Sequence, residues 1–260
     1  MARVATIREE RVAGELPLYR QPEWAAGFPW LLQGTTGRGD DGGYDLGLFG
    51  RTPVGEAVDR WRRLREALGV RGAAHARQVH GNDILLHTAG PPGLVVSERY
   101  DGHATTHPDI LLTVSVADCV PISLVEPRAR AVAILHGGWR GVAAGILERG
   151  VALLLQLAGA EAGALFLHLG PATCGRCYEV GPEVFEALEL PVPPRPTPLD
   201  LRAALADRAG ALGLDPARIS LSAFCTRCGD GDDATATPFF SHRGGCAGRQ
   251  LGFLAVRPDA

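Results

Sequence analysis

The sequence contains no lysine, so all 26 of its basic residues are arginines. Without lysine, the chain cannot form a Schiff base with a substrate, bind a nucleotide through a Walker A lysine, or use a lysine general base. It also lacks an apolar run approaching the roughly 20 residues that span a bilayer, and the N-terminal stretch contains no apolar signal-peptide core. These absences predict a cytoplasmic protein that does not bind membranes.

A strong charge of either sign is missing as well. The formal net charge is -3 and the isoelectric point is about 6.2, which leaves no broad basic surface for nucleic acid. A hydrophobic content of 46% over 260 residues is enough to bury a sizeable core. The proline-rich stretch 190–198 precedes further helix and strand patterns, so we interpret it as a surface loop and expect a single domain over residues 1–260.

Two apolar runs dominate the middle of the chain. Ile110 to Ala117 and Ala131 to Leu135 are rich in Val, Ile and Leu and have the length of buried strands. The first run is followed by Asp118 and Cys119, and the second by His136. If the two strands are neighbours, we expect this thiol and this imidazole to meet in space.

A second imidazole comes from His80, which lies beside a glycine ahead of another short apolar run. Two imidazoles and a thiolate, with a fourth position left for water, are the ligand pattern of a catalytic zinc, and copper suits these ligands too. Zinc in such a site lowers the pKa of its bound water toward about 7. His80, Cys119 and His136 are therefore the predicted metal ligands.

The residues alone leave other interpretations open. Cys119 could be a buried core thiol, with both histidines only satisfying hydrogen bonds. It could also be the nucleophile of a metal-free hydrolase, with a histidine as base and Asp118 as the group that orients it. A protein that binds a metal or a partner without catalysis is a third class. His103 and His107 compete as ligands, but neither ends a clear buried strand, so we expect surface or hydrogen-bonding roles for them.

Arg140 lies in the glycine-rich turn 137–141, directly after His136. We expect this turn to begin a helix that carries Val142, Ile146, Leu153 and Leu157 on one face. The first backbone N–H groups of a helix are unpaired and favour an anion, and Arg140 would add a full charge there. A tight turn without a binding role is the alternative.

Patterns elsewhere predict further elements. Thr52 as N-cap, Pro53 in the first turn and Gly69 at the end bound a helix. The glycine-rich stretch 34–43 predicts a loop, and residues 44–49 a short strand. We expect further strands at 165–169, 219–224 and 251–256, and further helices at 182–190 and 200–212.

The cysteines form two C-x-x-C pairs, Cys174 with Cys177 and Cys225 with Cys228. Each pair resembles half of a structural zinc site. The gap between the pairs, however, is far longer than the roughly 15 to 20 residues of a zinc ribbon. The spacing therefore favours disulfides or plain thiols over a four-cysteine zinc, and the sequence leaves the use of these pairs open.

Seven short motifs follow one another in the order found in a known family. They are Gln78-Val79-His80-Gly81, Ala117-Asp118-Cys119-Val120-Pro121, His136-Gly137-Gly138-Trp139-Arg140-Gly141, Cys177-Tyr178-Glu179-Val180, Asp200-Leu201, Cys225-Thr226 and Phe239-Phe240-Ser241-His242-Arg243. By these motifs the chain resembles the multicopper polyphenol oxidase (laccase-like) family, also called the YfiH family. Seven motifs in order are more specific than any one of them, and they favour the metal site over the core-residue interpretation.

The resemblance implies an α+β fold in which two mixed sheets pack between helix layers. It also implies a zinc held by His80, Cys119 and His136, and a purine nucleoside enzyme. The implied reactions are phosphorolysis of adenosine, inosine and methylthioadenosine, and deamination of adenosine. The substrates would then be purine nucleosides and phosphate.

These reactions require particular residues. Deamination usually employs a glutamate as acid and base, but the sequence has no H-x-E signature, so Asp118 is the catalytic candidate. Phosphorolysis needs cationic groups for phosphate, for which Arg140 is the first candidate and Arg38 and Arg243 are weaker ones. Editing of peptidoglycan precursors is a further activity linked to the family. A true laccase needs many histidine ligands for several coppers, and eight scattered histidines make that less favoured.

Overall fold

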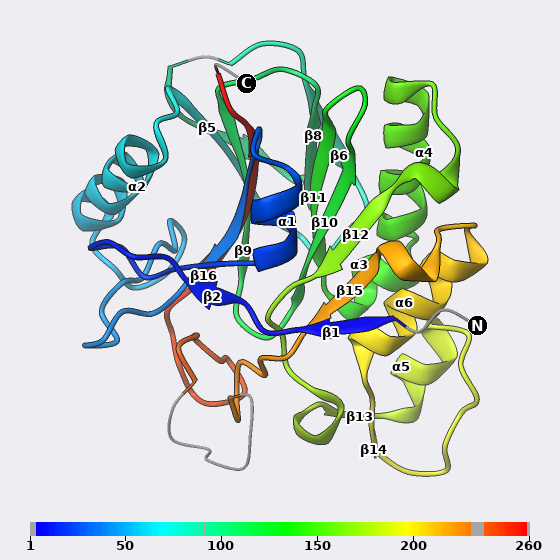
Figure 1. Cartoon of the computed structure of the whole chain (residues 1–260). Coiled ribbons are helices and arrows are strands. Elements are labelled where there is room, and N and C mark those ends of the chain that lie inside the picture. Colours follow the sequence, from blue (N-terminus) through cyan, green and yellow to red (C-terminus); the bar gives the residue numbers. More distant parts are fainter. Residues whose placement is uncertain (1–3, 91, 230–236, 259–260) are drawn as a thin grey trace.

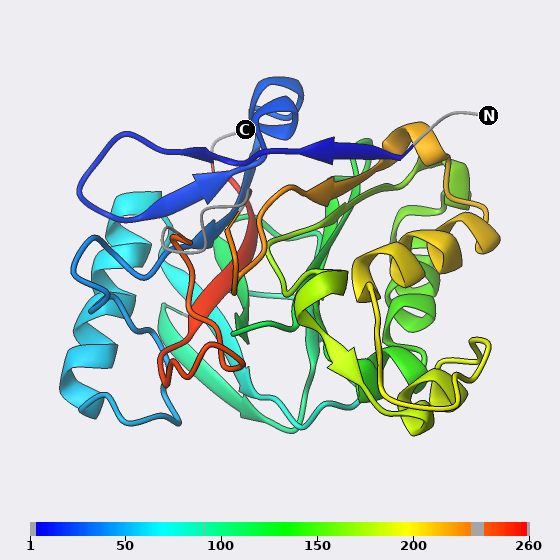
Figure 2. The same ribbon diagram turned by 90° about the horizontal axis from the view of Figure 1, so that it is seen from below.

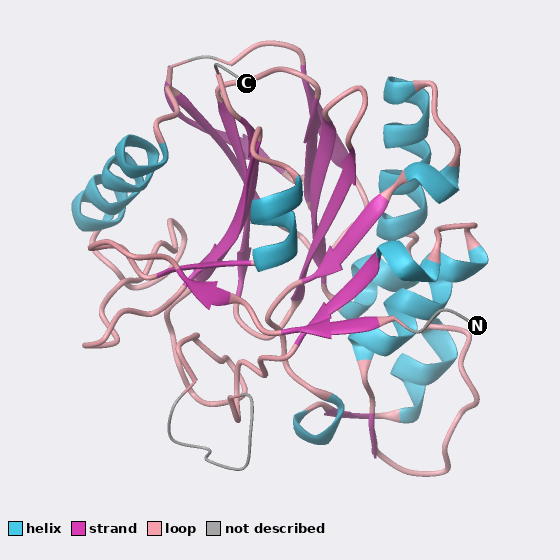
Figure 3. Ribbon diagram, in the orientation of Figure 1, coloured by secondary structure: helices cyan, strands magenta, loops and turns pink. Residues whose placement is uncertain are grey.

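The computed structural model describes residues 4–90, 92–229 and 237–258. In this described part, two seven-stranded sheets lie face to face, with helices on the outer side of each (Figures 1 and 3). Both sheets contain parallel and antiparallel pairs. The predicted α+β fold, with two mixed sheets packed between helix layers, is confirmed.

The first sheet combines strands from both halves of the chain. From one edge to the other it contains β1 (Ala5–Ile7), β15 (Ile219–Ser222), β12 (Phe166–Leu169), β10 (Val120–Glu126), β11 (Ala131–Gly137), β8 (Gly102–Thr105) and β6 (Ile84–His87). β10 runs antiparallel to both of its neighbours, β11 and β12. The outer face is covered by α4 (Ile146–Ala158) and α6 (Leu201–Ala211), with α3 (Trp139–Ala143) and α5 (Pro182–Ala187) beside them (Figure 1).

The second sheet contains, in order, β2 (Glu10–Arg11), β3 (Leu18–Arg20), β4 (Leu31–Thr36), β16 (Gln250–Val256), β9 (Ile110–Val116), β5 (Gly72–Arg77) and β7 (Gly93–Glu98). The long helix α2 (Val54–Leu68) covers its outer face, and the short helix α1 (Pro22–Gly27) packs against β4. The remaining elements are the small pair β13 (Glu179–Val180) and β14 (Thr197–Pro198) and the 3-10 turns η1 (Ala162–Ala164), η2 (Gly175–Cys177) and η3 (Pro216–Arg218).

Alternating side chains divide β9 between two apolar layers. Ile110, Leu112, Val114 and Val116 face the first sheet, whereas Leu111 packs with α2. Both faces of the strand are therefore largely buried, which explains why only Thr113 and Ser115 interrupt its apolar sequence. At the centre of the sandwich, Gly252 lets the sheets approach closely, because a Cβ there would lie 2.6 Å from Pro121 Cβ and 3.3 Å from Ile134 Cδ1.

The chain passes repeatedly from one sheet to the other, since the strands from β5 to β10 alternate between the second and the first sheet. β1 belongs to the first sheet and β2 to the second, so the N-terminal segment runs along both (Figure 2). One of the tight crossings follows β9, which ends at Val116 in the second sheet, while β10 begins at Val120 in the first. Residues 117–119 make this crossing, and they include Asp118 and Cys119.

The predicted helix over α2 is confirmed, with a different N-cap. Pro53 occupies the N-cap position, and the hydroxyl of Thr52 donates instead to the carboxylate of Asp45. Gly69 ends the helix in the left-handed conformation, with φ of 68°, as its position predicts.

The single helix predicted after His136 is two helices. Gly145 adopts φ of 84° between α3 and α4, a left-handed conformation that interrupts the helical path. The buried face of α4 accordingly consists of Ile146, Leu147, Gly150, Val151 and Leu154. Leu153 and Leu157, which the prediction placed on that face, are only half-buried.

Three further expectations need correction. The glycine-rich stretch predicted as a loop begins inside β4, and residues 44–49 form a loop where a strand was expected. Strand β10 was not anticipated, since it contains Pro121, and proline is unusual in a central strand.

In the part of the chain that the structure describes, no helix is long and apolar enough to cross a membrane.

Candidate metal centre

The three predicted metal ligands meet at one end of the sandwich. His80 follows β5, Cys119 lies on the crossing between β9 and β10, and His136 is near the end of β11. One ligand atom from each lies within 4.8 Å of the others. We call these residues the ligand triad. His80 follows a strand of the second sheet and His136 lies in a strand of the first, so the ligand triad forms only when the two sheets pack together.

Strand register places two of the ligands. His136 pairs with Pro121 across the antiparallel ladder, so it lies beside the start of β10 and close to Cys119. His136 follows Val132 and Ile134 at steps of two and therefore points, like them, between the sheets. Cys119 packs against the same inter-sheet core.

A buried carboxylate orients His136. Asp101 Oδ1 lies 2.9 Å from Nδ1 of His136, and the side chain of Asp101 is fully buried. Burial alone would raise the pKa of Asp101, but its hydrogen bonds from His136 and from backbone N–H groups lower it. The ionised carboxylate can only accept a hydrogen bond, so Nδ1 of His136 carries the hydrogen. Nε2 of His136 is then the atom directed toward the other two ligands.

Asp101 also holds the loop that carries His80. Its carboxylate accepts from the backbone N–H groups of Val79, His80 and Gly81 at 3.0, 2.9 and 2.8 Å. His80 has φ of 59°, a left-handed conformation that costs energy for a residue with a side chain. One carboxylate thus positions two of the three ligands. No motif in the sequence marks Asp101 for this role, and the only signal was that a ligating histidine needs a partner for its second nitrogen.

Within the ligand triad, the thiol of Cys119 and the imidazole of His136 form a charged pair. Burial alone would raise the pKa of the Cys119 thiol, yet His136 and His80 lower it to about 6. Burial alone would lower the pKa of His136, while Cys119 and Asp101 raise it to about 9. A thiolate beside an imidazolium at neutral pH is a group that exchanges its shared proton readily for a metal ion.

The backbone beside the ligand triad leaves no room for another side chain. A Cβ on Gly138 would lie 2.7 Å from His80 Cδ2, 3.4 Å from Cys119 Sγ and 3.5 Å from His136 Cε1. Glycine at this position therefore preserves the space around the three ligand atoms.

The ligand triad opens onto a cavity of about 420 Å³, which all three of its residues line. The ring of Phe49, 57% exposed, lies in this cavity and stacks against His75 with centroids 6.4 Å apart. Thr113 Oγ1 donates to the carbonyl of Ala74 and lies 3.0 Å from Nδ1 of His75. The single hydroxyl hydrogen is used, so Nδ1 of His75 must donate, which leaves Nε2 as an acceptor.

Asp118 is buried and fully hydrogen-bonded. Its Oδ1 accepts from Thr226 Oγ1 at 2.6 Å, and its Oδ2 accepts from the backbone N–H of Arg243 at 2.7 Å. Its own backbone has φ of 88°. These bonds connect the crossing that carries Cys119 to two loops from the C-terminal part of the chain.

Arg140 and Arg243 both lie close to Tyr178. The guanidinium of Arg243 is 4.6 Å from the centroid of the Tyr178 ring, and that of Arg140 is 4.4 Å from the ring of Trp139. The pKa of Tyr178 is raised to about 12, mainly by burial and also by Cys119 and Asp118, whereas Arg243 and Arg140 oppose the rise. Both arginines are close enough to Tyr178 to act on its charge. Neither forms an ion pair with another described residue.

The remaining candidates lie elsewhere. His103 is buried in β8, with Nδ1 2.9 Å from Nε2 of His87, as expected for a hydrogen-bonding histidine. His107 is exposed after β8. Arg38 follows β4, and its backbone N–H donates to the carbonyl of Pro238.

Comparison with known proteins agrees with this architecture. The family model of the multi-copper polyphenol oxidoreductase laccases matches residues 53–257. A relative from Geobacillus stearothermophilus, purine nucleoside phosphorylase YlmD, is 32% identical over 247 residues, covering 87% of this chain and 88% of the relative. A purine nucleoside phosphorylase from Deinococcus radiodurans is 34% identical over 174 residues, covering 65% of each chain.

Solved structures show the same fold. The crystal structure of YlmD from Geobacillus stearothermophilus has a TM-score of 0.84 and 29% identity, covering 96% of this chain and 99% of that one. The hypothetical protein YfiH from Bacillus licheniformis has a TM-score of 0.82 at 23% identity, covering 93% and 97% of the two chains. This chain therefore belongs to the multi-copper polyphenol oxidoreductase laccase family, also called the YfiH family, as its seven motifs predicted.

Proposed function

We propose that this protein is a zinc-dependent purine nucleoside phosphorylase. It would convert adenosine, inosine or methylthioadenosine and phosphate into the free base and the sugar 1-phosphate, with deamination of adenosine as a further activity. The observation that carries the proposal is the ligand triad, oriented by Asp101 and open to a cavity of about 420 Å³. Cavities of this size suit small-molecule substrates. The names of the relatives support a nucleoside substrate.

The ligand triad fits a metal ion by its donor chemistry. Cys119 is acidified, His136 is oriented through its second nitrogen, and Gly138 keeps the adjoining space free. Two imidazoles and one thiolate suit zinc, with copper as the competing metal. A zinc ion there would supply a Lewis acid that stabilises negative charge developing on the substrate.

Phosphorolysis needs a bound anion. A phosphate oxygen forms a bond to C1′ of the ribose, the bond from C1′ to N9 breaks, and its electron pair leaves with the base, which takes up a proton. Arg140 and Arg243 are exposed, lie close to Tyr178 and form no ion pair with a carboxylate among the described residues. We assign them to phosphate binding, since guanidinium groups pair well with phosphate oxygens.

The base would lie against Phe49. Its exposed ring offers a stacking face inside the cavity, and Nε2 of the neighbouring His75 is an acceptor for a purine N–H group. Asp118 enters the proposal as a positioning residue, because both of its oxygens are occupied and one of them holds the backbone of Arg243.

Product analysis tests the proposal. Purified zinc-loaded protein is incubated with adenosine, with and without phosphate, and the products are identified by mass spectrometry. Adenine and ribose 1-phosphate formed only with phosphate support phosphorolysis, and inosine supports deamination. Arg243→Ala should raise the KM for phosphate at least tenfold, whereas Arg62→Ala, on the exposed face of α2, should leave it unchanged. Absence of every product from zinc-loaded protein would overturn the proposal.

The acidified thiol of Cys119 favours one alternative, a metal-free cysteine hydrolase that could include editing of peptidoglycan precursors. This alternative predicts that chelator-treated protein stays active and that substrate protects Cys119 from alkylation. Multicopper oxidation finds less support. Among the described residues, two clusters could hold a metal, and only the ligand triad contains histidine.

A further inference from the structure

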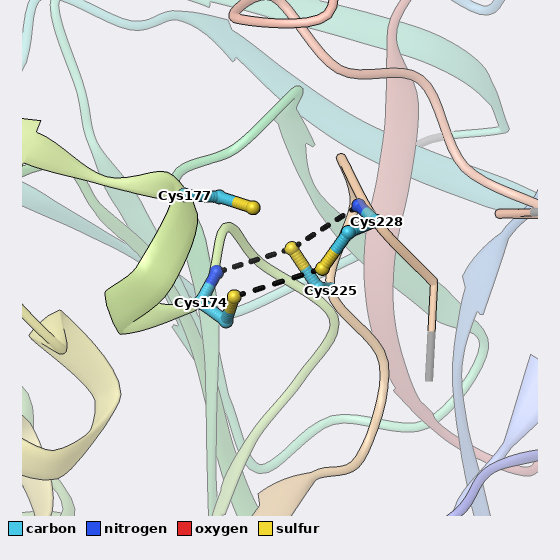
Figure 4. A group of neighbouring side chains, drawn as sticks. All are labelled: Cys174, Cys177, Cys225 and Cys228. Atoms are coloured by element: carbon cyan, nitrogen blue, oxygen red, sulfur yellow. Dashed lines mark hydrogen bonds between the residues drawn. The ribbon is translucent and has the colours of Figure 1, made fainter. Parts of the chain in front are cut away.

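The two C-x-x-C pairs meet in space despite their separation in sequence. Cys174 is the N-cap of the 3-10 turn η2 and Cys177 is its last residue, and Cys225 and Cys228 lie on the loop after β15. The four sulfur atoms lie within 4.8 Å of one another and point toward a common centre (Figure 4). We call these residues the cysteine cluster. It is separate from the ligand triad and plays no part in the proposed phosphorolysis.

The spacing of the sulfurs suits a metal. With Zn–S bonds of about 2.3 Å, the sulfurs of a tetrahedral site lie about 3.8 Å apart. The Sγ atoms of Cys174 and Cys228 lie 3.8 Å apart, and all six cysteines of the chain are free thiols. A disulfide would join sulfurs only in pairs, at about 2.05 Å, and gives no reason for four to gather around one point.

The backbone around the cysteine cluster is arranged to stabilise a thiolate. Sγ of Cys225 accepts from the backbone N–H groups of Cys174, Arg227 and Cys228 at 3.3 to 3.4 Å. Gly229 follows the second pair with φ of 75°, which allows the loop to fold back and pair with Cys225. Donors that surround a ligand atom in this way are typical of built metal sites.

We propose that Cys174, Cys177, Cys225 and Cys228 bind a structural zinc ion. Four protein thiolates complete a tetrahedral shell and leave no position for a substrate, so this ion has no catalytic role. Three of the four cysteines are half-buried, which leaves the metal a route into the site.

The position of the cysteine cluster explains what the zinc does. Thr226, next to Cys225, donates to the side chain of Asp118, and the backbone N–H of Thr173, next to Cys174, donates to its carbonyl. Both loops of the cluster thus hold the residue before Cys119. The structural zinc fixes these loops and, through Asp118, the crossing that supplies the thiolate of the ligand triad.

The first experiment removes the ligand triad and keeps the cysteine cluster. The double variant Cys119→Ala/His136→Ala is purified in reducing buffer, loaded with zinc and desalted. We expect one zinc per chain by elemental analysis, and an X-ray absorption spectrum of a zinc surrounded by four sulfurs at about 2.3 Å. A folded variant without zinc, or with zinc bound mainly by nitrogen or oxygen, would overturn the proposal.

The second experiment removes the cysteine cluster. Cys174→Ser/Cys228→Ser should lose one zinc per chain relative to wild type and should melt at a lower temperature, since a structural zinc stabilises only the folded state. Cys246→Ser is the matched control, because Cys246 belongs to neither metal group. The same zinc content in both variants would contradict the proposal, as would two disulfides in freshly purified wild type by mass spectrometry. If the double serine variant does not fold, the first experiment still decides.

Discussion

A single buried carboxylate, Asp101, controls the geometry of the ligand triad. It fixes the tautomer of His136 and holds the backbone of His80 in a left-handed conformation. We predict that Asp101→Asn weakens zinc binding 10- to 100-fold, as loss of the partner of a ligating histidine typically does. Competition with a chelating dye would measure the change in affinity.

The matched control for this change is Asp83→Asn. The carboxylate of Asp83 is exposed and pairs with Arg149, while its backbone carbonyl accepts from the N–H of Asp101 and is not altered by the substitution. Equal zinc affinities of Asp101→Asn and Asp83→Asn would show that Asp101 does not orient a metal ligand.

His75 makes a different contribution at the residue scale, to stability in acid. Burial lowers its pKa to about 4 from an ordinary value of 6.5. A histidine with a lowered pKa favours folding above pH 6.5, and this contribution is lost as the pH falls through about 4. At about 1.4 kcal/mol for each pKa unit, the free energy of unfolding should fall by about 3 kcal/mol over this window.

Urea unfolding of His75→Phe would isolate this contribution. Phenylalanine keeps a ring of similar size beside Trp61 but cannot titrate, and the hydroxyl of Thr113 still donates to Ala74. The difference between wild type and variant should therefore change by about 3 kcal/mol between pH 7 and pH 4, while the titrations of the other histidines cancel. If the free energies of unfolding of the two proteins differed by the same amount at pH 7 and pH 4, the lowered pKa of His75 would not contribute to stability.

At the scale of elements, the turn between β11 and α3 should tolerate no side chain at Gly138. Its φ of -79° and ψ of 148° are allowed for alanine, so only the contact of a Cβ with His80, at 2.7 Å, opposes the change. We predict that Gly138→Ala retains the far-ultraviolet circular dichroism of the wild type but loses zinc affinity and activity. Elemental analysis and a turnover assay would measure both.

Gly210→Ala provides the contrasting change within α6. A Cβ there meets nothing within 4 Å, and alanine favours a helix over glycine by roughly 0.5–1 kcal/mol. The variant should therefore be slightly more stable than wild type, with unchanged zinc content. If Gly138→Ala also kept the zinc content of the wild type, the space beside the ligand triad would not be needed for metal binding.

Elements with strong local patterns could be predicted from the sequence. The apolar runs of β9 and β11 identified both strands, and Gly69 identified the end of α2. Elements determined by the rest of the fold were missed. β10 contains Pro121, a residue that argues against a central strand when the sequence is considered alone. Gly145 interrupts the helix after the turn by adopting a left-handed conformation that glycine permits but does not require.

The same distinction applies to the site. Cys119 and His136 could be predicted because each follows a recognisable apolar strand, and His80 because it lies in a motif beside a glycine. Asp101 could not, because its role depends on a loop 20 residues away in sequence, where it binds Gly81. The cysteine pairs were judged by their separation along the chain, although β12 and β15 are parallel neighbours that bring the pairs together.

At the scale of the whole molecule, the two sheets should unfold together. Ile134 is fully buried between them, near Gly252 of the opposite sheet. We predict that Ile134→Ala lowers the free energy of unfolding by about 2–5 kcal/mol. Hydrogen exchange followed by mass spectrometry should show equal losses of protection in β10 and in β16.

Val192→Ala is the control, because this side chain is 56% exposed and its truncation should change stability by less than about 0.5 kcal/mol. Loss of protection in the first sheet alone would mean that the sheets unfold independently, which would also contradict the expectation of a single domain.

The pairing of early strands with late ones affects how the protein emerges from the ribosome. Ala5 of β1 pairs with Ser220 of β15, and Thr35 of β4 pairs with Gly252 of β16. At about 5–20 residues per second, translation needs roughly 10–40 seconds between the first and second member of each pair. During that interval β1 and one side of β4 present unpaired backbone edges, the feature that promotes association between nascent chains. Synthesis in the cell therefore exposes this protein to aggregation before either sheet can be completed.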